Sequence, residues 1–85
     1  MKMRRILEKV QAFLDADSHS QLKQKESISE VLEKLRDKEK ELHRELELCT
    51  DAEKRKKLQR KLSVCHAQRK KGLTILKELR TQAPE

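Results

Sequence analysis

The sequence predicts an all-α fold: an antiparallel helical hairpin, coiled-coil-like, with a short N-terminal helix packed at its open end. Composition is the first reason. Charged residues make up 44% of the 85-residue chain, which contains one Gly, one Pro and one aromatic residue. This composition is typical of long helices and supplies too few turn residues for a β-sandwich or barrel. The second reason is a pair of heptad-spaced apolar stripes, and the third is that both stripes fit one antiparallel register. A chain of this length forms at most one small domain.

Residues 1–16 are expected to form the short helix. Their apolar side chains recur at the spacing of one helix face, at Met3, Ile6, Leu7, Val10, Phe13 and Leu14. Charged residues interrupt this stretch, so it does not resemble a signal peptide, and no run approaches the roughly 20 apolar residues of a membrane span. A helix lying on a membrane surface is one alternative. Packing against the rest of the protein explains the stripe more simply.

A connector rich in cap-forming residues follows, and a long helix over 19–49 comes next. Two capping boxes are possible, beginning at Ser18 and at Ser27, each with Gln or Glu three residues later. We favour the earlier start, because Leu22 then finds a partner in Leu79 across the hairpin. The heptad stripe of this helix contains Ile28, Leu32, Leu35, Glu39, Leu42, Leu46 and Cys49.

A third capping box, Thr50 with Glu53, predicts a second long helix over 51–81, followed by a polar tail at 82–85. Its stripe has the same spacing and contains Leu58, Leu62, Cys65, Arg69, Gly72, Leu76 and Leu79. If the chain reverses near residue 50, the numbers of facing residues should sum to about 100. Leu35 then faces Cys65 and Ile28 faces Gly72, so the two stripes fit one hairpin.

The seam of this hairpin contains three unusual positions. Gly72 would let a side chain such as Phe13 approach the backbone, or it is merely tolerated there. Arg69 and Glu39 are charges at seam positions, where a charge commonly sets register or oligomer state. We expect Arg69 to pair with Glu33 and to be structural.

The hairpin buries little apolar surface near its turn, so we expect a homodimer built from four long and two short helices. The register places the two cysteines roughly 21 Å apart along the axis, at about 1.5 Å per residue. It therefore predicts separate reduced thiols rather than an intramolecular disulfide. No zinc-ligand spacing, phosphate-binding loop or nucleophile–base motif is present in the sequence. We therefore expect no metal, cofactor or small-molecule substrate, no enzymatic activity, and a cytoplasmic location.

Charge asymmetry is the strongest indication of function. The formal net charge of the chain is +7, and residues 54–71 contain nine Lys or Arg and no acidic residue. The candidate binding residues are Lys54, Arg55, Lys56, Lys57, Arg60, Lys61, Lys70 and Lys71, and Arg69 is the remaining basic residue of this segment. They could follow a phosphate backbone or an acidic protein surface. Alternatively, Glu45 and Glu47 could neutralise Lys54 and Arg55 around the turn.

These observations predict a small helical-hairpin interaction protein, adaptor- or co-chaperone-like, that binds another macromolecule through exposed helix faces. The alternative is a nucleic-acid-binding protein without sequence specificity that uses the basic helix at 54–71. The lack of aromatic residues and of a helix-turn-helix spacing argues against base-specific recognition.

Overall fold

The computed structural model describes residues 3–82 and contains four helices. They are α1 (Met3–Asp15), α2 (Ser18–Lys23), α3 (Lys25–Leu48) and α4 (Ala52–Gln82). The described residues include no strand, so the all-α prediction is confirmed. No helix in this part of the chain combines the length and the apolar character that a membrane span requires.

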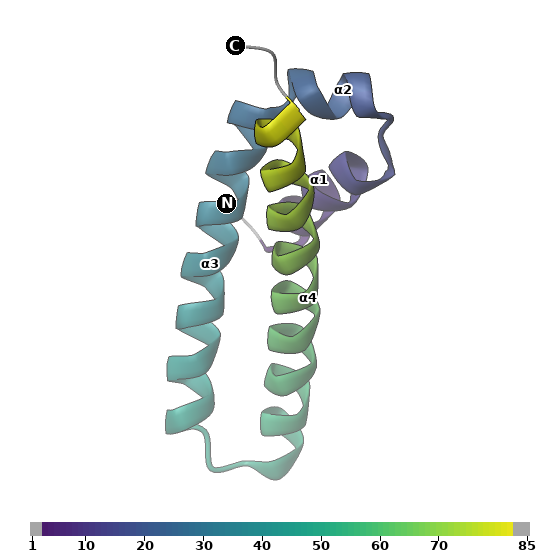
Figure 1. Cartoon of the computed structure of the whole chain (residues 1–85). Coiled ribbons are helices and arrows are strands. Elements are labelled where there is room, and N and C mark those ends of the chain that lie inside the picture. The colour runs from purple at the N-terminus through teal and green to yellow at the C-terminus, as the bar shows by residue number, and fades with distance from the viewer. Residues whose placement is uncertain (1–2, 83–85) are drawn as a thin grey trace.

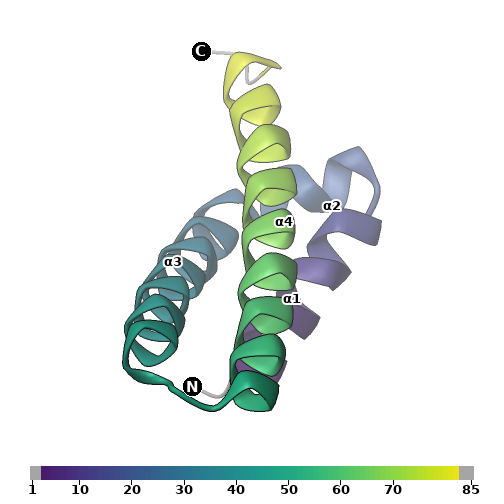
Figure 2. The same cartoon turned by 90° about the horizontal axis from the view of Figure 1, so that it is seen from below.

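The two long helices α3 and α4 run antiparallel and side by side, as the heptad stripes predicted (Figure 1). The short helix α1 crosses this pair obliquely in the half away from the turn, and it contacts both long helices (Figure 2). The fold is therefore a hairpin with a third helix packed across part of its length. It is elongated, with extents of 51 × 19 × 19 Å.

The predicted 19–49 helix is divided in two. The chain bends at Gln24, whose backbone N–H donates to the carbonyl oxygens of Ser20 and Gln21, and α3 starts at the next residue. The cap of α2 is Asp17 rather than Ser18, because its carboxylate accepts a hydrogen bond from the Ser20 amide at 2.8 Å. This hydrogen bond lowers the pKa of Asp17 below its ordinary value. The predicted seam position of Leu22 is wrong: it lies on α2 and is 38% exposed.

The turn between the long helices is held by two side chains. The cap of α4 is Asp51 rather than the predicted Thr50, since its Oδ1 accepts from the Glu53 amide at 2.9 Å. Arg55 donates from one guanidinium nitrogen to the carbonyl oxygens of Leu46 at 2.6 Å and Cys49 at 3.1 Å. These carbonyls lie at the C-terminus of α3, where backbone acceptors lack partners within the helix. Arg55 therefore closes the hairpin.

The core lies where α1 meets the long helices. Ile6, Val10 and Phe13 of α1 are almost completely buried, as are Leu35 of α3 and Cys65 of α4. Burying one large aliphatic or aromatic side chain stabilises a fold by about 1.5–3 kcal/mol. The α1 stripe therefore contributes a large share of the stability of this small protein, as its spacing predicted.

The register in the half away from the turn is displaced by one helical turn from the predicted one. Leu32, rather than Ile28, lies over Gly72: a Cβ at Gly72 would be 2.8 Å from Leu32 Cδ2. The predicted approach of Phe13 to Gly72 is therefore replaced by the approach of Leu32. A constant sum of residue numbers fixes the register only to within about one helical turn, because residues one turn apart share the same face.

Candidate functional site

The structure divides the nine basic residues of 54–71 into two groups. Arg55 is half-buried at the turn and Arg69 is half-buried beside Glu39, so both have structural partners. The predicted neutralisation of Arg55 by Glu47 is wrong, because Arg55 binds backbone carbonyls instead. The other seven are exposed: Lys54, Lys56, Lys57, Arg60, Lys61, Lys70 and Lys71.

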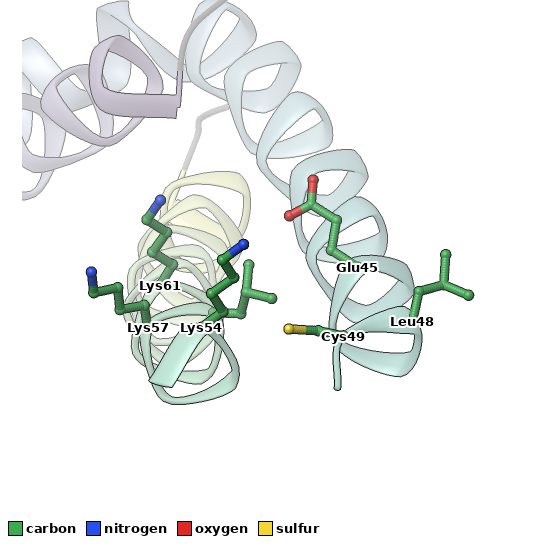
Figure 3. A pocket seen from close by; sticks show the side chains of 7 residues that line it. Glu45, Leu48, Cys49, Lys54, Lys57 and Lys61 are labelled. Carbon is green, nitrogen blue, oxygen red and sulfur yellow. The ribbon is translucent and has the colours of Figure 1, made fainter. Parts of the chain in front are cut away.

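Three of the exposed lysines border a groove between α3 and α4 near the turn. Figure 3 shows this groove, which is lined by Glu45, Leu48 and Cys49 of α3 and by Lys54, Lys57, Leu58 and Lys61 of α4. We call these seven residues the turn groove. Lys70 and Lys71 lie elsewhere, in a second groove beside Leu14 and Asp15 of α1. The predicted basic segment is therefore not one continuous binding surface.

Helix geometry explains why the three lysines gather at the turn groove. Lys54, Lys57 and Lys61 are three and four positions apart, so they share one face of α4. The ammonium groups of Lys54 and Lys61 and the Glu45 carboxylate project to the same side of the helix pair, whereas Lys57 points outward from α4 (Figure 3). The Cys49 side chain, at the end of α3, points toward α4 (Figure 3).

The charge of the turn groove is positive and is not cancelled by ion pairs among the described residues. Within residues 3–82 the ion pairs are Arg4–Glu8, Lys38–Glu41, His66–Glu39 and Arg69–Glu39. None of them includes a turn-groove lysine. Three ammonium groups and one carboxylate therefore border an apolar lining. This arrangement favours an anionic ligand that also has apolar groups.

A second polar cluster lies at the seam and has a structural role. Glu39 is only 5% exposed, and its two carboxylate oxygens contact the Arg69 guanidinium and, at 3.0 Å, His66 Nδ1. The predicted pair of Arg69 with Glu33 is therefore wrong. A buried carboxylate destabilises the fold unless it has a charged or hydrogen-bonding partner. Glu39 is buried, so it is the carboxylate that requires the Arg69 guanidinium.

The two cysteines are free thiols in different surroundings. Cys49 is half-buried at the turn groove, with its Sγ 3.6 Å from the Asp51 carbonyl oxygen. Cys65 is fully buried, and its Sγ lies 3.4 Å from Met3 Sδ. Burial, with a further contribution from the nearby Glu39 charge, raises the pKa of the Cys65 thiol. In the part of the chain that the structure describes, no three His, Cys, Asp or Glu residues converge as metal ligands.

The sequence indicated the lysines of the turn groove and placed Cys49 and Leu58 on the heptad stripes, but it did not indicate that they form one groove. Leu48 is off the heptad stripe and 78% exposed, which is unusual for a large apolar residue beside a seam. Leu48 lies one helical turn from Glu45 and opposite the spaced lysines of the second helix. This position was the feature of the sequence that could have indicated the groove.

Comparison with known proteins provides no relative from which a function could be transferred. No protein-family model, no curated protein and no solved structure matches the chain. The use of the turn groove therefore has to be inferred from its own residues.

Proposed function

We propose that this chain is a non-catalytic helical-hairpin interaction protein, which binds an acidic segment of another protein at the turn groove. The single observation that supports this proposal most strongly is the apolar groove bordered by Lys54, Lys57 and Lys61, with Glu45 as its only acidic member. Desolvated apolar contacts supply affinity, while charges around the edge steer and orient the partner. An adaptor or co-chaperone-like role would use such a site.

The groove favours a protein partner over nucleic acid. A phosphate backbone is bound mainly through charge, and it would gain nothing from Leu48, Cys49 and Leu58. Single-stranded bases stack on aromatic side chains, and the chain contains none besides the fully buried Phe13. Nucleic-acid binding by the exposed basic residues is therefore the second candidate.

A pair of matched triple variants tests the proposal. The variant Lys54→Gln/Lys57→Gln/Lys61→Gln removes three charges from the turn groove. The control Lys56→Gln/Arg60→Gln/Lys70→Gln removes three exposed charges that do not line it. Exposed ion pairs contribute about 0.2–1 kcal/mol each, so the groove variant should bind polyglutamate roughly tenfold more weakly. The control should bind within about threefold of the unmodified chain, with binding measured by fluorescence anisotropy at constant salt.

The same measurement with a DNA duplex distinguishes the second candidate. Equal losses in both triple variants, with duplex bound more tightly than polyglutamate, would support a general phosphate-binding surface and contradict the groove. Affinity for the duplex should then fall steeply between about 50 and 200 mM salt. Circular dichroism of each variant establishes that helicity is retained.

We also propose a homodimer and a cytoplasmic location, which keeps both free thiols reduced. The exposed Leu48 and Val64 are the apolar side chains near the turn that a second copy could cover. Light scattering after size exclusion should give about twice the 10.1 kDa chain mass, and a single species at the monomer mass would rule the dimer out.

A further inference from the structure

The turn groove lies beside a surface that already accepts a helix. α1 packs across the other half of the hairpin and contacts both long helices, with Ile6, Val10 and Phe13 almost completely buried there. Within residues 3–82, no helix covers the half nearer the turn (Figure 1). The hairpin is thus three helices thick in one half and two helices thick in the other.

The two surfaces meet at Lys61. This residue lines the turn groove and also lines the groove beside α1, together with Met3 and Leu7. The groove beside α1 is formed by α1 and α4, so the two grooves adjoin on the face of α4 that contains Lys61. A second helical segment could occupy the turn groove without displacing α1.

Resting on the proposed function, we infer that the partner segment is an acidic amphipathic helix that lies in the turn groove as a third helix of the bundle. Its apolar stripe would cover Cys49 and Leu58, and carboxylates beside that stripe would face Lys54, Lys57 and Lys61. This is recognition of a helix by a groove through side chains at i, i+3 or i+4, and i+7. The edge of the bound helix that faces Glu45 should be neutral or basic.

The length of the groove sets the length of the segment. The part of α4 from its start at Ala52 to Lys61 rises about 14 Å at 1.5 Å per residue. A bound helix of about 10–12 residues would span it, which is close to the length of α1. An isolated helix this short is marginal in water, so the segment would fold as it binds.

Cys49 provides a direct test, because its half-buried thiol lies inside the proposed contact. The probe is a designed helix-forming peptide of about 14 residues, with leucines on one face and glutamates on both sides of them. Its control is a permuted peptide of identical composition without an apolar face, and polyglutamate is the charge-only probe. The rate of maleimide addition to Cys49 is followed by peptide mapping, which separates it from Cys65.

At saturation the amphipathic peptide should slow labelling of Cys49 at least about tenfold, because a docked helix removes the thiol from solvent. The permuted peptide and polyglutamate should leave the labelling rate nearly unchanged. Leu58→Gln, which replaces an apolar side chain of the groove, should weaken the amphipathic peptide about tenfold, given the value of burying a leucine, and circular dichroism establishes that the variant keeps its helicity. Its affinity for polyglutamate should not change.

The outcomes separate this inference from the proposed function. Equal affinity for the amphipathic and permuted peptides, or binding that leaves Cys49 fully reactive, would overturn the helical partner. The lysine-bordered acidic site would survive that result if the groove triple variant still weakened both peptides. Failure of all three acidic probes to bind would overturn the inference and the proposed function together.

Discussion

At the scale of single residues, Cys65 shows how burial changes the chemistry of one side chain. Its thiol is fully buried and its pKa is raised, first by burial and then by the Glu39 charge. The unfolded chain ionises this thiol near the ordinary value of 9.0, whereas the folded chain still holds the proton at that pH. Above that pH the unfolded state therefore binds fewer protons than the folded state, and the free energy of unfolding must fall as pH rises.

We predict that the stability advantage of the unmodified chain over Cys65→Ala narrows as the pH rises through 9.0, the ordinary pKa of the thiol. The contribution of the thiol should decrease by up to about 1.4 kcal/mol per pH unit. Urea denaturation at several pH values measures this difference, and the other titrating groups cancel because both proteins contain them. A constant difference as the pH rises through this value would mean that Cys65 ionises as readily in the folded state as in the unfolded one.

The sequence predicted which residues are buried better than it predicted which residues contact one another. The heptad spacing correctly placed Cys65, Gly72 and Leu35 on the inward face. It named the wrong partner for Gly72, because Ile28 and Leu32 lie one turn apart on the same face and spacing alone does not decide between them. Arg69 was likewise correctly placed at the seam but paired with the wrong carboxylate, since which acid becomes buried depends on the final register.

At the scale of elements, the seam between α3 and α4 depends on the pair formed by Glu39 and Arg69. Removing one partner of a buried ion pair costs up to about 3–5 kcal/mol, because the remaining charge stays buried. Arg69 is partly exposed, with 24% of its side chain accessible, so water screens part of that cost.

We predict that Arg69→Met destabilises the protein by about 2 kcal/mol, because Glu39 loses its strongest partner. The double variant Glu39→Met/Arg69→Met should recover most of this loss, since no buried charge remains and methionine packs well at helix seams. Urea denaturation of the unmodified chain, of the single variants Arg69→Met and Glu39→Met, and of the double variant gives the coupling energy. Arg4→Met, which breaks the exposed pair with Glu8, should change stability by less than about 0.5 kcal/mol. Additive effects at the two seam positions would contradict this assignment.

Helix boundaries could be predicted only to within a few residues. At two helix starts the capping-box pattern indicated a hydroxyl, Ser18 or Thr50, whereas the carboxylate of the neighbouring residue forms the cap: Asp17 and Asp51. The bend at Gln24 was missed because no Gly or Pro marks it.

At the scale of the whole molecule, the hairpin and its third helix could be predicted, whereas the turn groove could not. The positive charge of 54–71 is evident from the sequence. The groove depends on where α1 stops covering the hairpin and on which basic side chains the fold uses internally. Arg55 and Arg69 are the basic side chains that bind partners within the fold. Both facts follow from tertiary packing, and neither has a local signal.

The stability of the whole molecule should depend on α1, because two long helices alone bury little apolar surface. A chain of 85 residues typically has a free energy of unfolding of about 4–13 kcal/mol. Replacing a fully buried Phe by Ala costs about 3–5 kcal/mol, and Phe13 is fully buried where α1 meets the hairpin.

We therefore predict that Phe13→Ala lowers the melting temperature of α3 and α4 along with that of α1. Circular dichroism at 222 nm should show a single transition shifted downward by well over ten degrees, since about 1 kcal/mol shifts a domain of this size by 4–8 °C. Leu48→Ala, at an exposed position, should shift it by a few degrees at most. Loss of only the small signal of α1, with the remaining helicity melting at its original temperature, would mean that α3 and α4 fold without it. In that case α1 would itself be a detachable occupant of the hairpin, comparable with the helix that we infer for the turn groove.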